Sequence, residues 1–189
     1  MTQLMTETGM VRVPAGTWNV DPVHSHVAFE VKHMRIATVR GEFREFEGTL
    51  QAAEDDPTNS RAWGSANVNS IDTGNPDRDD HLRSPDFFDA EHYPEIRFES
   101  TRVTHVEGST YRVAGDLTIK DTTREVELDA TVQGADKDPW GNERVGVAVR
   151  GAINRTDFGL RWQQRLETGG LLVGEEVRLL LDISAVRAD

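Results

Sequence analysis

Histidine and acidic side chains gather in two segments where they could bind a metal ion. His24 and His26 stand at alternate positions, which places them on one face of an extended strand, and His33 follows nearby. His81 comes directly after two aspartates. Imidazole and carboxylate groups are ligands for zinc or iron. Because His33 has the opposite parity to the pair, surface or rim positions explain these histidines better than a closed metal site.

Nucleophilic catalysis has a weaker basis in the sequence. Ser25 lies between two histidines, but no G-x-S-x-G elbow occurs and no acid is placed to orient either imidazole. The Gly169-Gly170 pair lacks the lysine of a phosphate-binding loop, and cysteine is absent. Carboxylates are too abundant for an acid–base pair to be chosen from spacing. The enzymatic alternative is therefore a metal- or histidine-dependent reaction on a small apolar substrate, through His33 or a histidine-bound metal.

Adjacent aromatic residues and one arginine point to a different chemistry, the binding of an amphiphile. Phe87 and Phe88 follow Pro85 on a polar turn, and burying each ring stabilises a fold by roughly 1.5–3 kcal/mol. We expect them to enter an apolar interior from its rim. Arg155 stands where an inner strand ends, so it could meet an anionic head group or pair with a structural aspartate, and the sequence favours the salt bridge.

Composition limits the partners and the location of the chain. The 189 residues include 21 basic and 33 acidic side chains, a formal charge of −12, which disfavours nucleic acid and anionic membranes. Residues 1–13 contain no apolar run typical of a signal peptide, and no segment has transmembrane length. We expect a cytoplasmic protein without stable membrane insertion, in which 1–13 is disordered or loosely attached and 14–189 is one domain.

Most of the chain alternates polar and apolar residues with period two, which is typical of strands with one buried face. The alternation predicts strands at 25–33, 39–52, 63–71, 95–106, 110–120, 124–133, 144–154 and 175–186. The parity change near Arg44-Glu45 indicates a β-bulge. One helix is predicted from Pro76 to Arg83, with Thr73 or Asn75 as its N-cap.

Eight or so antiparallel strands with little helix favour a closed barrel over a flat sandwich. Gly115 and Gly151 inside strands suggest barrel corners, and residues 107–109 suggest a hairpin turn with Gly108 at a positive φ. A small barrel of this size can hold one ligand.

Several motifs in order along residues 18–186 resemble the YceI family of lipocalin-like, polyisoprenoid-binding proteins. They are Trp18-x-x-Asp21-x-x-His24-Ser25, Gly41-x-Phe43-x-x-Phe46-x-Gly48, Arg78-Asp79-x-His81-Leu82-x-Ser84-x-Asp86-Phe87-Phe88, Tyr93-Pro94-x-Ile96-x-Phe98-x-Ser100, Gly115-Asp116-Leu117-Thr118-Ile119 and Asn154-Arg155-x-Asp157-Phe158-Gly159. The segment Lys120-Asp121-Thr122 departs from the family, in which a glycine commonly follows this run.

The resemblance implies an all-β fold: an antiparallel, eight-stranded, lipocalin-like barrel with one short helix and an internal apolar channel. It also implies an isoprenoid or similar long-chain lipid as ligand, no settled enzymatic activity, and a homodimer in many members. We predict no catalytic residue, metal or cofactor other than the bound lipid. The predicted ligand-binding residues are Val27, Phe29, Val31, His33, Phe43, Phe46, Asp79, His81, Phe87, Phe88, Phe98, Leu117, Arg155 and Phe158. Ser25 is a further candidate polar contact.

Overall fold

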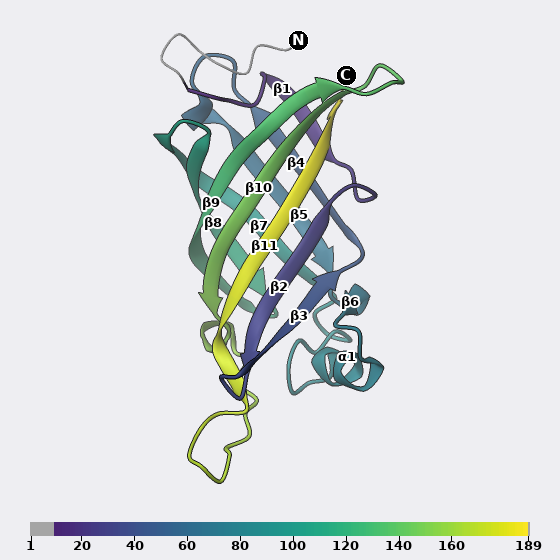
Figure 1. The fold of residues 1–189 in the computed structure, drawn as a ribbon, viewed down its shortest axis with the longest axis vertical. Helices are drawn as coiled ribbons and strands as arrows, with labels where there is room; N and C mark the ends of the chain where they lie inside the picture. Colours follow the sequence, from purple (N-terminus) through teal and green to yellow (C-terminus); the bar gives the residue numbers. More distant parts are fainter. Residues whose placement is uncertain (1–9, 189) are drawn as a thin grey trace.

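Antiparallel strands form one sheet that closes on itself in the computed structural model, which describes residues 10–188 (Figure 1). The strands are β1 (Gly16–Val20), β2 (His26–His33), β3 (Ala37–Phe43), β4 (Phe46–Ala52), β5 (Arg61–Asn67), β6 (Ile71–Asp72), β7 (Glu95–Glu107), β8 (Thr110–Ile119), β9 (Thr122–Lys137), β10 (Glu143–Asn154) and β11 (Val173–Ala188). The helices are α1 (Pro76–Arg83) and three 3-10 turns, η1 (Pro57–Asn59), η2 (Val68–Ser70) and η3 (Arg155–Phe158).

Eight of these strands make the closed barrel, because β1 pairs with both β4 and β11. Around the barrel the order is β1-β4-β5-β7-β8-β9-β10-β11, and β2 and β3 extend the sheet beside the first half of β11. Every pairing is antiparallel. The prediction of an all-β barrel with one short helix is confirmed.

The prediction of one bulged strand over 39–52 is wrong. The chain forms β3 and β4 as separate strands, and Arg44-Glu45 is the turn between them. Backbone hydrogen bonds hold this turn against the end of β5: Asn67 N donates to the Glu45 carbonyl and Arg44 N to the Ser70 carbonyl. The predicted strand 63–71 is likewise broken by η2. Strand β1, which closes the barrel, was not predicted.

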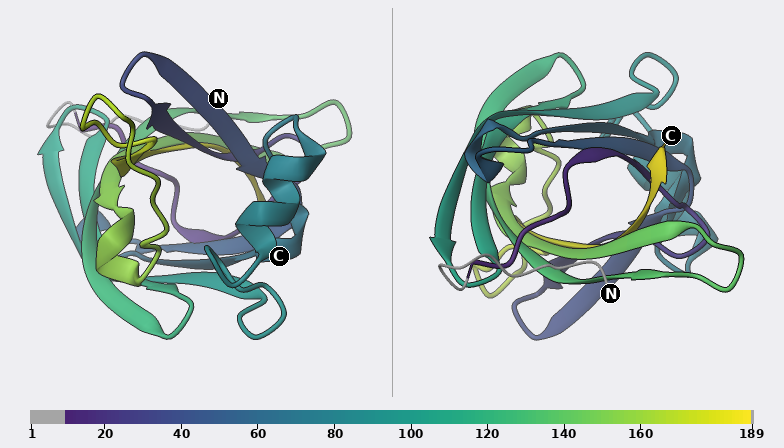
Figure 2. Two further views of the ribbon diagram at one scale, coloured as in Figure 1. Left: turned by 90° about the horizontal axis from the view of Figure 1, so that it is seen from below. Right: turned by 90° about the horizontal axis from the view of Figure 1, so that it is seen from above.

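Helix α1 has the predicted bounds and Asn75 as its N-cap. The Asn75 side chain accepts a hydrogen bond from Arg78 N at 3.0 Å, and Pro76 occupies the first turn, where its missing N–H costs nothing. The helix lies on one side of the lower opening of the barrel, across from η3 and the loop after it (Figure 2, left). These two segments therefore flank that end.

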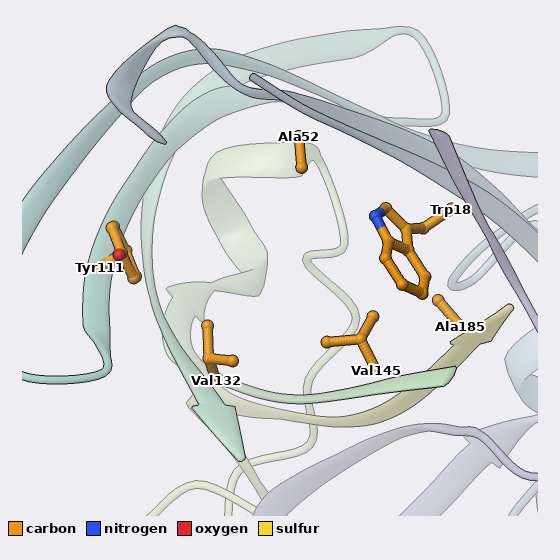
Figure 3. Packing of buried hydrophobic residues seen from close by; sticks show 6 residues of the cluster. All are labelled: Trp18, Ala52, Tyr111, Val132, Val145 and Ala185. Carbon is orange, nitrogen blue, oxygen red and sulfur yellow. The ribbon is translucent and has the colours of Figure 1, made fainter. Parts of the chain in front are cut away.

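Buried side chains close the upper end of the barrel. Trp18 is 1% exposed, and its indole N–H donates to the Pro14 carbonyl at 2.8 Å. The other buried residues of this cluster come from β4, β8, β9, β10 and β11 and point toward the barrel interior (Figure 3): Ala52, Tyr111, Val132, Val145 and Ala185.

The segment before β1 crosses this upper end (Figure 2, right). Val11 donates its N–H to the Gly108 carbonyl and accepts from the Tyr111 hydroxyl, while Met10 and Val13 pack on the cluster. Of the predicted loosely attached segment 1–13, residues 10–13 thus contact the barrel. Residues 1–9 lie outside the described residues.

Candidate functional site

An apolar cavity of about 410 Å³ runs along the barrel interior. Inward-facing side chains of most strands line it, and this volume is typical of small-molecule sites. It extends from Val145 and Ala185 at the upper end to Leu160 and Arg155 at the lower end. A space of this kind inside a barrel can exclude water from a hydrocarbon chain.

Most of the predicted ligand-binding residues border this cavity. The lining contains Val27, Phe29, Val31, Phe43, Phe46, Phe87, Phe88, Phe98, Leu117 and Arg155. Phe87 is buried, and Phe88 packs edge-on to Phe43 with ring centroids 6.1 Å apart. The two adjacent rings therefore do enter the interior from the α1 side.

Four predicted residues do not border the cavity: His33, Asp79, His81 and Phe158. His33 ends β2 opposite Ala37 and Val173. Phe158 is 2% exposed and packs against Leu117 and Ile119, which do border the cavity. Its role is to fill the lower core.

Asp79 and His81 hold α1 and its surroundings together. Asp79 is buried and accepts hydrogen bonds from the N–H and hydroxyl of Thr73, at 2.9 and 2.6 Å. His81 bonds Asp86 through Nε2 at 2.8 Å and lies edge-on to Trp162, with centroids 4.8 Å apart. It thereby connects α1 with the loop that follows η3.

Ser25 also has a structural role. Its buried hydroxyl donates to the Ser184 carbonyl at 3.1 Å and accepts from Ser184 N at 2.9 Å. His24 and His26 are exposed and contact Asp21 and Glu42, at 2.7 and 3.4 Å. Among residues 10–188, no group of three or more potential ligands could hold a metal ion.

The predicted salt bridge of Arg155 with an aspartate is wrong, because the hydrogen-bond partners of Arg155 within residues 10–188 are main-chain carbonyls. Its buried guanidinium donates to four main-chain carbonyl oxygens: Nε to Gly174 at 2.8 Å, Nη1 to Leu160 at 2.6 Å and Trp162 at 3.0 Å, and Nη2 to Val173 at 3.4 Å. Burial lowers the pKa of Arg155 from its usual value, while the charge of Glu175 opposes that shift. The side chain fastens η3 and the following loop to the start of β11.

The predicted ligand-binding residues omit the longest apolar row of the lining, on β11. Val177, Leu179, Leu181 and Ile183 all border the cavity, and Arg178, Leu180 and Asp182 stand between them. This recurrence at every second position was a usable signal in the sequence, because such spacing predicts one buried face of a strand.

None of the helices within residues 10–188 has the length and apolar character needed to cross a membrane.

Comparisons with known proteins agree with the barrel fold. The model of the YceI-like domain matches residues 18–185. A UPF0312 protein of Staphylococcus epidermidis is 38% identical over 162 residues, covering 85% of this chain and 92% of that protein. A UPF0312 protein of Photorhabdus laumondii is 35% identical over 164 residues, covering 87% and 82%.

Solved structures share the fold at lower identity. Burkholderia cenocepacia BcnA superposes with a TM-score of 0.77 at 24% identity, covering 87% of this chain and 98% of that one. A polyisoprenoid binding domain from Saccharophagus degradans gives a TM-score of 0.70 at 15% identity, covering 90% and 98%. With its motifs, its closed barrel and these matches, the chain belongs to the YceI-like family.

Proposed function

We propose that this protein binds a long-chain isoprenoid or similar amphiphilic lipid inside the barrel, without catalysing a reaction. The observation that carries the proposal is the apolar cavity of about 410 Å³, which residues of β1–β5 and β7–β11 border. Support also comes from the fold shared with the polyisoprenoid binding domain of Saccharophagus degradans.

The energetics of such a site depend on hydrocarbon burial. Each methylene moved from water contributes about 0.8 kcal/mol, so one five-carbon isoprene unit contributes roughly 4 kcal/mol. Association costs on the order of 4–15 kcal/mol in lost freedom. A chain of a few isoprene units offsets this cost, so we expect the wall to select for apolar bulk more than for an exact length.

Noncatalytic binding also fits the positions of the candidate catalytic groups. The imidazoles of His24 and His26 are on the outside of the barrel, each against a carboxylate, and His81 packs on Trp162. Neither these three residues nor His33 borders the cavity. A substrate in the interior would therefore not meet them.

Extraction of the purified protein tests the proposal. Organic extraction followed by lipid mass spectrometry should release a long-chain amphiphile in a ratio near one per chain. Delipidated protein should then take up a prenyl alcohol such as geranylgeraniol. Absence of a copurifying amphiphile together with no uptake of prenyl or acyl chains contradicts the proposal.

A further inference from the structure

Arg155 brings a buried positive charge to the cavity lining. Its side chain is only 4% exposed. The other charged residues of the lining are exposed, and the two arginines among them are paired outside the barrel, Arg61 with Glu99 and Arg97 with Glu95. Within residues 10–188, Arg155 is therefore the one buried charged side chain that borders the cavity.

The partners of Arg155 are neutral. Carbonyl oxygens accept its hydrogen bonds but carry no net charge, so none of its hydrogen-bond partners neutralises the positive charge in this region of low dielectric. Glu175 influences it only through its charge and forms no hydrogen bond with it. A guanidinium has five donors, and the four hydrogen bonds leave one N–H on Nη2, whose existing contact is the longest at 3.4 Å.

Among residues 10–188, the opposite end of the cavity has no buried charged side chain. Tyr111 is neutral and already donates its hydroxyl to the Val11 carbonyl at 2.8 Å. Ser60, also in the lining, accepts a hydrogen bond from Ala53 N at 3.0 Å. In the part of the chain that the structure describes, an amphiphile with a charged oxygen group therefore finds a buried charged donor only at the lower end, beside η3.

We infer that the lipid bound in the barrel carries an anionic oxygen head group, a carboxylate or a phosphate, and that this head group lies beside Arg155 at the lower end of the cavity. This inference rests on the proposed function. Attraction between opposite charges is strongest where water is excluded, and charge-assisted hydrogen bonds to a guanidinium are about twice as strong as neutral ones. The hydrocarbon tail then extends toward Trp18.

Matched ligand pairs test the charge of the head group in the wild-type protein. Farnesyl phosphate is compared with farnesol, and palmitate with hexadecanol, by equilibrium titration of delipidated protein. We expect each anion to bind at least tenfold more tightly than its neutral partner, and the better of the two anions distinguishes phosphate from carboxylate. Equal affinities within both pairs overturn the inference but leave the proposed function intact, whereas no binding of any of the four contradicts the proposed function itself.

Substitution of Arg155 tests the residue. The Arg155→Gln protein should bind each anion and its neutral partner with about equal affinity. Arg155→Lys, which keeps the charge, should still bind the anion clearly more tightly. Retention of the full preference in a folded Arg155→Gln protein overturns the assignment to this residue.

The orientation of the ligand gives a test that needs no variant, in case Arg155→Gln fails to fold. A palmitate with a nitroxide at its tail end broadens the amide resonances that lie near the tail. We expect broadening at Val145 and Ala185, at the upper end, and sharp resonances at Leu160 and Gly174, which surround Arg155. The reverse pattern overturns the inference.

Discussion

The guanidinium of Arg144 donates through Nη1 to Oδ2 of Asp21 at 2.7 Å, across 123 positions of sequence. Its Nε donates to Oδ2 of Asp138 at 2.9 Å. One arginine near the start of β10 thus joins the turn after β1 to the β9–β10 hairpin. The hydrogen bond from Arg144, with a further one from His24, lowers the pKa of Asp21 to about 2.

Acid should destabilise the protein by protonating Asp21 and Asp138, the two carboxylates that Arg144 contacts. Because the folded-state pKa of Asp21 lies below its usual value of 3.8, its contribution to stability is present above about pH 4 and lost as the pH falls toward 2. Asp138, whose pKa is lowered mainly by Asn142, acts in the same direction. Urea unfolding between pH 2 and pH 6 should show a falling midpoint on acidification, less steep in Asp21→Asn.

The matched control for this prediction is Asp129→Asn, which removes an exposed carboxylate paired with Arg112. At neutral pH we expect Asp21→Asn to cost about 1.5–3 kcal/mol, as for other hydrogen bonds to charged groups, and the control to cost under about 1 kcal/mol. If both variants give the wild-type pH profile, Asp21 is not the group responsible.

Gly115→Ala should destabilise the protein through a clash inside the barrel wall. A Cβ at this position would overlap Cζ of the Phe98 ring and lie 2.6 Å from the Glu99 carbonyl oxygen. Overpacking of this kind costs typically 1–3 kcal/mol, measured as a shift in the chemical unfolding midpoint. Gly134→Ala is the control, since nothing lies within 4 Å of its Cβ; an equal loss in both variants would refute the packing argument.

The barrel was predictable from the sequence because period-two alternation is a local signal. The turn at Arg44-Glu45 was not predictable, because a β-bulge within one strand produces the same change of parity. Only the pairing of β4 with β1 and β5 distinguishes a turn between two strands from a bulge in one. The partners of Arg155 were also hidden, since main-chain carbonyls leave no signature in residue types. For the cavity lining, the sequence predicted the aromatic residues Phe29, Phe43 and Phe46 of β2 to β4. It did not predict the β11 residues, because the place of β11 in the sheet depends on topology.

Leu181→Trp should block the cavity at little cost to stability. Leu181 borders the cavity midway along β11, opposite Val27 and Val149, where open space can accept a larger ring. We expect a loss of lipid uptake with a change in unfolding free energy below about 1 kcal/mol, less than the 1–3 kcal/mol of a filled core. Leu180→Trp, on the opposite face of the strand, should leave uptake unchanged.

Trp18→Phe should loosen the upper end of the barrel. It removes the indole N–H that donates to the Pro14 carbonyl at 2.8 Å and leaves a smaller ring in the cluster. The lost hydrogen bond and the smaller contact area should together cost about 1–3 kcal/mol, measured by urea unfolding. Faster amide hydrogen exchange at Val11, compared with Gly174 at the far end, should accompany this loss, and unchanged exchange at Val11 would show that Trp18 does not secure the segment.

Homodimer formation and cytoplasmic location stay predictions from the sequence. Size-exclusion chromatography with light scattering measures the mass of the protein in solution directly. A mass near twice 21.1 kDa supports the dimer, and a mass near 21.1 kDa contradicts it.

Native mass spectrometry of the delipidated protein with geranylgeraniol tests the central claim most directly, because it counts ligands bound to each chain. We predict a single adduct on the wild-type protein and on Leu180→Trp, and none or a strongly reduced one on Leu181→Trp. Wild-type protein that takes up no prenyl or acyl chain, or a Leu181→Trp protein that binds as well as wild type, would contradict the claim that the interior holds the ligand.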